Sequence, residues 1–484
     1  MKPTSKAPTR SKGRSPATKR RAASRPAAPP AGARPVRAAA AKKPAGFTVE
    51  REPRIGGRVY RARTSSGTPV AVRPMPGFSK SVALLSTRFG SLDERLPDGR
   101  PLPLGLAHFL EHKMFETPQG DIFDRYAKRG ASANAYTTFS HTTYLFSCTS
   151  RFEENLDTLL DTLATMHAEP AGIEREKGII GQEIAMYDDD PGWRGQFNLL
   201  RALYRDHPIR HDITGSKETI APIDRATLIA THAAYYHPAN LSLFVAGDVD
   251  PAAVLARAEA RLVGTVPGAE DRRAPGAEHH RAPVLEPAEV ASPELRQVLS
   301  VHRPQVTLGL KDSAVGSRGP ALVRRETETE LLLDVLYGDG GRVEAPLYRE
   351  GIVDESFSAG YDADQDYGFV AISAEVDEEE PYRTRLLELT EAAARTPITA
   401  AELERSRRRS FGGYVRTFNA PERVASLLLG LHMKEARLED AVGALDRVTP
   451  ADLDERLRAL LACGRAWSVV APRGGGVAAP AANE

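Results

Sequence analysis

Cysteine is scarce in this chain of 484 residues: Cys148 and Cys463 lie far apart and show neither metal-binding nor redox spacing. A disulfide framework is therefore excluded, and we expect a reducing compartment, the cytoplasm. No apolar run approaches the roughly 18 residues that a membrane-spanning helix needs, and we find no apolar segment of a secretion signal. Hydrophobic residues make up 41% and charged residues 27% of the chain, the balance of a protein with a sizeable core.

Residues 1–45 lack acidic side chains altogether, although they hold 13 lysines and arginines and eight prolines. Large apolar residues are also rare there, so this segment can bury little surface, and the prolines interrupt any long helix. We predict a disordered basic tail; the same prolines argue against an organellar transit peptide, which it resembles in composition. The rest of the chain has 52 basic and 64 acidic residues. Any contact with nucleic acid is therefore expected from the tail alone.

A proline-rich, charged stretch separates two halves with regular hydrophobic patterning. Residues 267–293 contain five prolines and the run AEDRRAPGAEHHRAP. Each half mixes short apolar strands with longer amphipathic helices, which predicts the α+β class for both. We predict five segments: a disordered basic tail at 1–45, a domain at 46–265, a linker at 266–295, a second domain at 296–475 and a disordered tail at 476–484.

Individual elements can be predicted within both halves. The apolar runs SVALLST and LSLFVAG in the first half, and YGFVAIS and AWSVVAP in the second, predict strands. A helix is predicted at Leu156–Leu163, where leucines recur at helical spacing. Another is predicted around Leu453–Leu461, with Thr449 as its cap and Pro450 at its first position.

An internal repeat relates the two halves. A shift of 230 residues aligns residues 173–191 with residues 403–421 and matches Pro191 with Pro421. The same shift brings Gly338, Gly341 and Arg342 onto the positions of His108, Glu111 and His112. We therefore predict that the second half is a copy without the chemistry described next.

The run HFLEH places His108, Glu111 and His112 within five residues. On a helix, positions four apart lie about 40° from each other and one turn along the axis, so the two imidazoles project toward one point. Two imidazoles at that spacing can bind one zinc ion. Zinc held by three protein ligands keeps a position for water and lowers the pKa of that water to about 7. Glu111 would lie beside the metal, where a general base is needed.

A third ligand must come from elsewhere in the chain. The segment at residues 174–190 offers Glu176 and Glu183, which are seven apart and therefore lie on one face of a helix. Spacing alone does not decide which of the two carboxylates binds the metal. The neighbouring apolar side chains that are available for packing are Ile179, Ile180 and Ile184.

Other histidines are weaker candidates. His207 and His211 also lie four apart, but Pro208 and the following DITG indicate a loop, so we do not expect them to bind metal. His279 and His280 fall in the predicted linker, where we expect them to be solvated.

Three segments carry a family resemblance: GLAHFLEHKMFE, GASANAYTTFSHTTYLFS and EREKGIIGQEIAMYDDDPGW, in that order. They resemble the insulinase, pitrilysin and mitochondrial processing peptidase family, the inverted zincin metallopeptidases, and most of all its bacterial YmfH-like branch. The similarity spans roughly residues 50–475 and is strongest up to about residue 250. It implies two homologous α+β domains of the insulinase type that form one half of a clamshell.

The resemblance also implies roles for the residues of the motif. His108, His112 and Glu183 would bind one zinc ion per chain, with Glu111 as the general base and Glu176 supporting the ligands from behind.

The segment SANAY is assigned by the same resemblance to an edge strand that pairs with the main chain of a peptide substrate. Asn134 and Ala135 would then lie closest to the scissile bond. Such pairing reads the backbone and favours extended or unfolded peptides. The alternative for Asn134 is a residue in a turn.

The function that the resemblance implies is a zinc-dependent metalloendopeptidase that hydrolyses peptides in an enclosed dimeric chamber. Active relatives present an Arg with a Tyr seven positions later, but here Arg349 is followed at that distance by Ser356, and Arg342 by Arg349. The chain is also about half the length of the single-chain members. We therefore expect a homodimer, or a heterodimer with a paralogous subunit that lacks the zinc motif. The alternative is a non-catalytic or partner-dependent accessory subunit.

Overall fold

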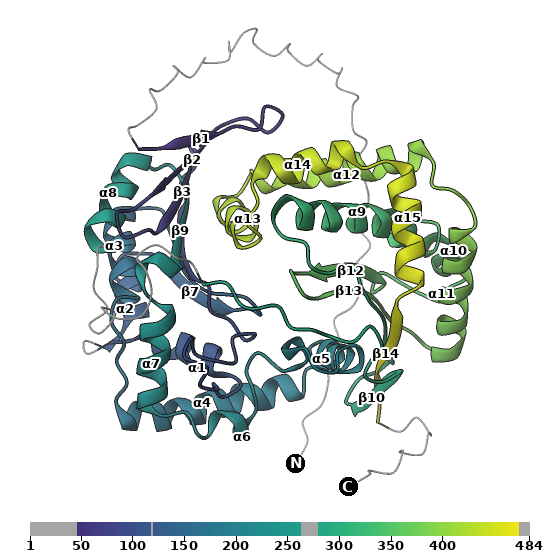
Figure 1. Ribbon diagram of the computed structural model, residues 1–484, viewed down its shortest axis with the longest axis horizontal. Coiled ribbons are helices and arrows are strands. Elements are labelled where there is room, and N and C mark those ends of the chain that lie inside the picture. Colours follow the sequence, from purple (N-terminus) through teal and green to yellow (C-terminus); the bar gives the residue numbers. More distant parts are fainter. Residues whose placement is uncertain (1–45, 118–119, 263–278, 474–484) are drawn as a thin grey trace, which may run out of the picture. The chain divides into compact units, whose positions relative to one another are not determined.

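The computed structural model describes residues 46–117, 120–262 and 279–473. The predicted tails at 1–45 and 476–484, and the first part of the predicted linker, lie outside the described residues. The described residues form two mixed β-sheets with helices packed against them (Figure 1). The predicted α+β class is therefore confirmed.

The first sheet has seven strands in the order β1-β2-β3-β9-β4-β8-β7, with β3 and β9 parallel and the other neighbours antiparallel. Its strands are β1 Thr48–Glu50, β2 Val59–Arg63, β3 Pro69–Pro74, β4 Ser81–Thr87, β7 Ser132–Thr137, β8 Thr142–Cys148 and β9 Leu241–Gly247. A short hairpin joins β5 Glu116–Thr117 to β6 Gly120–Asp121. The helices of this half are α1 Leu106–Lys113, α2 Ile122–Ala127, α3 Phe152–Thr162, α4 Pro170–Asp188, α5 Pro191–Leu203, α6 Lys217–Ile220, α7 Arg225–Tyr235 and α8 Pro251–Arg261, with the 3₁₀ turns η1 Pro208–Arg210 and η2 Pro238–Asn240.

The second sheet has five strands in the order β10-β14-β11-β13-β12, with β10 and β14 parallel. Its strands are β10 Glu294–Leu299, β11 Gln305–Lys311, β12 Ser358–Ala363, β13 Gly368–Glu375 and β14 Gly464–Pro472. The helices are α9 Gly319–Tyr337, α10 Glu344–Arg349, α11 Glu379–Ala394, α12 Ala400–Thr417, α13 Pro421–Met433, α14 Leu438–Arg447 and α15 Pro450–Leu461. The four apolar runs predicted as strands form β4, β9, β13 and β14, and Thr449 caps α15 as expected.

Both halves contribute to shared hydrophobic cores. Every residue of β4 and β9 is buried, because the first sheet is covered on both faces. One face packs on α1 and α3, whereas the other receives Leu428 and Leu429 of α13, from the second half. In return, α5 of the first half packs on β11 and β14. Leu199 of α5 approaches β11 so closely that a Cβ added at Gly309 would lie 2.6 Å from its side chain.

The predicted repeat is present in the structure. Helices α4 and α12 begin 230 residues apart, as do α5 and α13. The hairpins β7–β8 and β12–β13 have the same register at a shift of 226 residues, pairing Ser132 with Ser147 and Ser358 with Ser373. The second copy therefore has four more residues between its hairpin and its helix pair.

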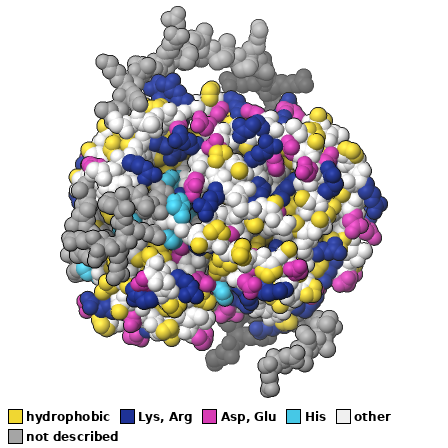
Figure 2. Space-filling view, viewed as in Figure 1, with side chains coloured by type: hydrophobic (Ala, Val, Ile, Leu, Met, Phe, Trp, Pro, Cys, Tyr) yellow, Lys and Arg dark blue, Asp and Glu magenta, His cyan; other side chains and the backbone are white. Residues whose placement is uncertain are grey.

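The distribution of surface charge and the length and hydropathy of the helices indicate which kinds of partner the chain can contact. In the face shown in Figure 2, Lys and Arg side chains are interspersed with Asp and Glu side chains, so this face presents no field of a single sign. Among the helices of the described ranges, none is long and apolar enough to cross a membrane.

Candidate metal site

Helix α1 is embedded in the first core and carries the HFLEH motif. It begins after Gly105, whose φ of 85° lies in the left-handed region, and a Cβ there would lie 2.4 Å from the carbonyl oxygen of Thr214. Phe109 and Leu110 are fully buried. Because they fasten α1 to the core, the opposite side of the helix faces α4 and presents the two histidines to it.

Glu183 of α4 lies opposite both histidines of α1. Its Oε1 is 3.7 Å from Nε2 of His108, and its Oε2 is 3.4 Å from Nε2 of His112. One ligand atom from each of the three side chains lies within 4.8 Å of the others. Zinc bonds of about 2.0–2.2 Å in a tetrahedron separate the ligands by roughly 3.3–3.6 Å, so this group has the chemistry and the spacing for one zinc ion.

Glu176, about two turns earlier on α4, contacts the other nitrogen of His112. Its Oε1 lies 3.0 Å from Nδ1, which leaves Nε2 of the same ring directed at Glu183. Glu176 and Glu183, which the spacing in the sequence could not distinguish, therefore lie next to different nitrogens of the His112 ring. This arrangement is typical of a carboxylate that orients a metal-binding histidine.

The predicted packing of α4 is correct for two of its three isoleucines. Ile180 and Ile184 are buried, whereas Ile179 is 48% exposed, so the prediction for Ile179 is wrong. Only one stripe of α4 faces the core, and Ile179 lies outside it.

Glu111 is buried beside this group and is hydrogen-bonded to the sheet. Thr137, in β7, donates a 2.6 Å hydrogen bond to Oε2 of Glu111. Burial raises the pKa of Glu111, and the hydrogen bond from Thr137 offsets part of that rise. Reasoning from the sequence missed Thr137, although its place next to SANAY was visible.

The ligand group is strongly coupled electrostatically. Burial and the neighbouring His112 lower the pKa of His108 to about 4. Burial acts the same way on His112, but its hydrogen bonds to Glu176 and Glu183 outweigh it and raise the pKa of His112 to about 9. The hydrogen bond with His112 lowers the pKa of Glu183. A divalent cation that binds here must displace the proton of His112.

Tyr187 stands one turn after Glu183 on α4. Burial and the charge of the Glu183 carboxylate raise the pKa of the Tyr187 hydroxyl group. The Tyr187 ring stacks on Trp193 with centroids 4.3 Å apart, and the indole nitrogen of Trp193 donates a 2.7 Å hydrogen bond to Asp212. Sequence reasoning did not single out Tyr187, and its position four residues after Glu183 was the available signal.

Strand β7 is the outermost strand of the first sheet, hydrogen-bonded to β8. Thr138 donates its N–H to His141 at the end of this hairpin, and alternate residues of a strand point the same way. The N–H of Ala135 therefore faces the open edge, where it donates to the side-chain oxygen of Asn134 at 2.9 Å. The predicted edge strand is confirmed, and the alternative of a turn at Asn134 is wrong; pairing with a substrate stays a prediction.

The other histidines considered in the sequence do not belong to this ligand group. His207 is fully buried with Nε2 3.3 Å from Asp366, and it precedes the 3₁₀ turn η1, in agreement with the predicted loop. His279 was expected to be solvated, but its Nε2 lies 2.7 Å from a carboxylate oxygen of Asp93 and its side chain is only 13% exposed. The expectation is therefore wrong for His279. His280 is about half exposed.

The residues that the 230-residue shift of the sequence brings onto the motif offer no metal ligands in the second copy. Gly338 caps α9, and Gly341 and Arg342 lie in the loop before α10. Nε and Nη2 of Arg342 each donate a 2.7 Å hydrogen bond to the Glu402 carboxylate, and Nη1 and Nη2 also donate to backbone carbonyl groups. Within the described ranges, His108, His112 and Glu183 are the one group of three or more potential ligands at metal-binding distances.

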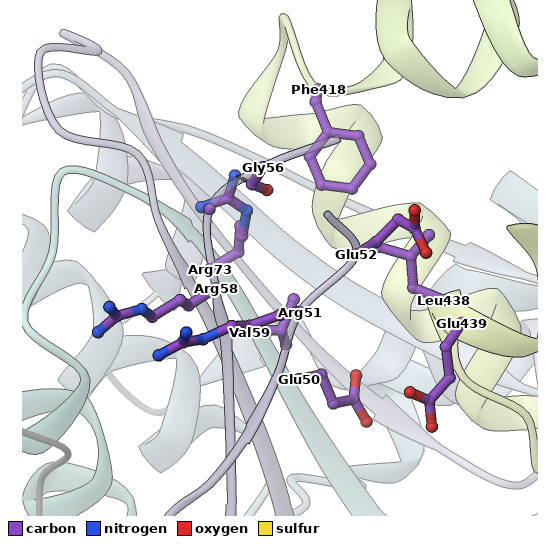
Figure 3. Close-up of a pocket in the computed structure, with 11 residues that line it drawn as sticks. Glu50, Arg51, Glu52, Gly56, Arg58, Val59, Arg73, Phe418, Leu438 and Glu439 are labelled. Carbon is purple, nitrogen blue, oxygen red and sulfur yellow. Dashed lines mark hydrogen bonds between the residues drawn. The ribbon is translucent and has the colours of Figure 1, made fainter. Parts of the chain in front are cut away.

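A separate pocket lies between the first strands and the helices of the second half (Figure 3). Acidic and basic side chains line it together with Phe418 and Leu438, and none of the candidate site residues does. This pocket is therefore separate from the candidate site between α1, α4 and β7.

Comparison with known families agrees with this arrangement of two copies. Residues 79–217 match the domain described as insulinase (peptidase family M16), and residues 222–410 match the peptidase M16 inactive domain. The chain therefore belongs to the insulinase family of M16 peptidases, which confirms the resemblance found in the sequence.

Individual relatives support the same assignment. The chain is 35% identical over 412 residues to the uncharacterized zinc protease YmfH of Bacillus subtilis, covering 84% of this chain and 95% of the relative. A putative M16-like peptidase from Alicyclobacillus acidocaldarius has a similar structure, with a TM-score of 0.80 and 30% identity over 88% of this chain and 98% of that chain. Pitrilysin shares the fold with a TM-score of 0.69 and 18% identity, over 88% of this chain and 47% of its own. Zinc and peptidase activity are thus properties of the family.

Proposed function

We propose that this protein is a zinc-dependent metalloendopeptidase that hydrolyses extended or unfolded peptides. The observation that carries the proposal is the meeting of three elements: the ligand group of His108, His112 and Glu183, the buried carboxylate of Glu111, and the open edge of β7. A scaffold protein would need the fold but not a carboxylate placed between the ligands and a free strand edge.

In this proposal His108, His112 and Glu183 hold one zinc ion per chain. Zinc, when bound, supplies a Lewis acid that polarises a peptide carbonyl group and makes water more acidic. Glu111 accepts a proton from the attacking water, because its Oε2 is held by Thr137 and its other oxygen remains available. Glu176 keeps the His112 ring in place through Nδ1.

The substrate pairs with β7 as an additional strand. The N–H of Ala135 is displaced from Asn134 and donates to the substrate main chain, which makes recognition independent of most side chains. Thr137 lies two residues further along β7, about 7 Å at the rise of a strand. A peptide paired at Asn134 and Ala135 therefore passes within reach of Glu111.

A second subunit completes the chamber. The chain spans about half the length of pitrilysin. Arg342, one of the two arginines considered for the Arg and Tyr pair, already donates a hydrogen bond to Glu402. The partner is a second copy of this chain or a paralogue without the zinc motif, and it contributes the groups that stabilise the developing oxyanion. We place this assembly in the cytoplasm. Gel filtration that finds a fully active monomer would refute the dimer.

The decisive experiment compares wild type with Glu111→Gln for zinc content and for cleavage of a quenched-fluorescent peptide library. We expect both proteins to bind zinc and only the wild type to cleave, with a loss in the variant of about 10²–10⁴-fold. Equal cleavage by the two proteins would disprove the role of Glu111.

One observation favours a second function, that of a non-catalytic or partner-dependent accessory subunit. The Arg and Tyr pair of active relatives is absent from the expected stretch of the sequence. If wild type and Glu111→Gln both bind zinc and neither cleaves, the accessory function is favoured. Adding the candidate partner subunit then distinguishes a partner-dependent enzyme from a scaffold.

A further inference from the structure

Lys113, the last residue of α1, is a fully buried lysine directly after His112. A buried ammonium group is costly unless it is paired, and lysine is among the residues least often found in a core. Its Nζ forms an ion pair with Glu116, whose side chain is 35% exposed. Nothing in the proposed reaction uses this charge, so its burial needs another explanation.

The Lys113–Glu116 pair lies against the helix that carries the other ligand. Glu116 also accepts a hydrogen bond from Arg175 of α4, the residue before Glu176. One turn earlier on α4 stands Gly172, where an added Cβ would lie 3.0 Å from both Nζ of Lys113 and Oε2 of Glu116. The absence of a side chain at Gly172 therefore lets the ion pair touch the backbone of α4.

We propose that Lys113 is a positioning residue that sets the separation of α1 and α4 at the metal site. This inference rests on the proposed function, because the separation matters through the 3.0 Å contact of His112 with Glu176 and the 3.4 Å contact of His112 with Glu183. An apolar side chain at this position would fill the same space but would have no directional contact with Glu116. A charge-assisted hydrogen bond fixes the geometry more closely than packing alone.

The test measures the zinc dissociation constant of wild type, Lys113→Met, Glu116→Gln and the double variant, by competition with a chelator. We expect each single variant to bind zinc at least 10-fold more weakly. The double variant should lose less than the product of the two losses, because both changes remove one contact. Lys177→Met is the matched control: Lys177 lies on α4 and pairs with Glu174, away from Gly172, and its variant should bind zinc like wild type.

Thermal unfolding in excess chelator separates positioning from plain stability. A lower melting temperature together with an unchanged zinc dissociation constant in both single variants would overturn the proposal. If Lys113→Met does not fold, Glu116→Gln decides, since its side chain is partly exposed and keeps its volume.

A crystal structure of Glu116→Gln supplies a readout that does not depend on zinc. We expect the distance between Nε2 of His112 and the Glu183 carboxylate to exceed that of wild type, and an unchanged distance would refute the inference. If wild type binds no zinc, the proposed function fails, whereas this distance still decides the role of Lys113.

Discussion

The hydroxyl group of Thr137 in β7 donates a 2.6 Å hydrogen bond to Oε2 of Glu111 in α1. This hydrogen bond connects the strand edge that we propose for substrate binding with the carboxylate that we propose as the base.

Thr137→Val should lower kcat about 10-fold or more, because hydrogen bonds to charged groups contribute about 1.5–3 kcal/mol. Zinc content should not change. Steady-state kinetics and metal analysis check this, with Thr138→Val as the control, since Thr138 bonds within the turn to His141. An undiminished kcat in Thr137→Val would argue against this orientation of Glu111.

Replacing Glu176 by Gln should weaken zinc binding without preventing folding. The amide keeps the size of the side chain but removes the charge beside Nδ1 of His112, and losses of about 10–100-fold in metal affinity are typical for such partners. The zinc dissociation constant is the measurement. Glu174→Gln is the control on the same helix, because Glu174 is largely exposed and pairs with Lys177. Equal zinc affinity in the two variants would contradict the role of Glu176.

Replacing Ala135 by Pro tests the open edge of β7. The N–H of Ala135 bonds to the Asn134 side chain and not to β8, so proline removes no hydrogen bond between the strands. We expect a folded protein with normal zinc content and a KM for peptides raised about 10-fold, since the donor to the substrate backbone is missing. Ala135→Ser keeps the N–H and should keep the KM near that of wild type. An unaltered KM in the proline variant would show that peptides bind elsewhere.

Acid should destabilise the second half through Glu402. Hydrogen bonds from the Arg342 guanidinium hold the pKa of Glu402 at about 2, below its ordinary value of 4.5. Because the folded-state pKa is depressed, this contribution is complete above about pH 4.5 and is lost as the pH falls toward 2. After solvent screening it amounts to about 1–2 kcal/mol.

Urea denaturation of wild type and Glu402→Gln between pH 7 and pH 2.5 tests this dependence. The difference in unfolding free energy should be largest at pH 7 and shrink as the pH falls through 4. Glu391→Gln, a change at an exposed position of α11, should show no such trend. A difference that does not vary with pH would exclude the ion pair as its source.

Much of the fold could be predicted from local patterns. The runs that form β4, β9, β13 and β14 are apolar over strand-length segments, and the spacing of leucines and the cap at Thr449 predict helices α3 and α15. The repeat was visible because Pro191 and Pro421 both open a helix at the same shift. The environment of His279 was not predictable, because Asp93 is far away in the sequence and reaches it only in the fold.

The candidate site could likewise be predicted only in part. HFLEH predicts two ligands and a base because helical geometry relates positions four apart within one segment. Thr137 and Tyr187 were missed because their surroundings depend on the register of β7 and on which side of α4 is turned toward α1. Such distances between elements are set by packing, which a single sequence does not display.

By itself, the sequence determined the α+β class, the duplicated plan, the family and the motif with its two histidines, since each depends on residues close together or on a constant shift. The resemblance implied Glu183 as the third ligand, and only the tertiary structure showed that Glu183 faces both histidines while Glu176 contacts Nδ1 of His112. The tertiary structure also decided that the N–H of Ala135 faces an open edge and that Lys113 is buried against α4. The physical reason is that two residues seven apart on a helix lie on the same face, but this spacing does not determine how far each side chain lies from the neighbouring helix. That distance depends on how α1 and α4 pack together.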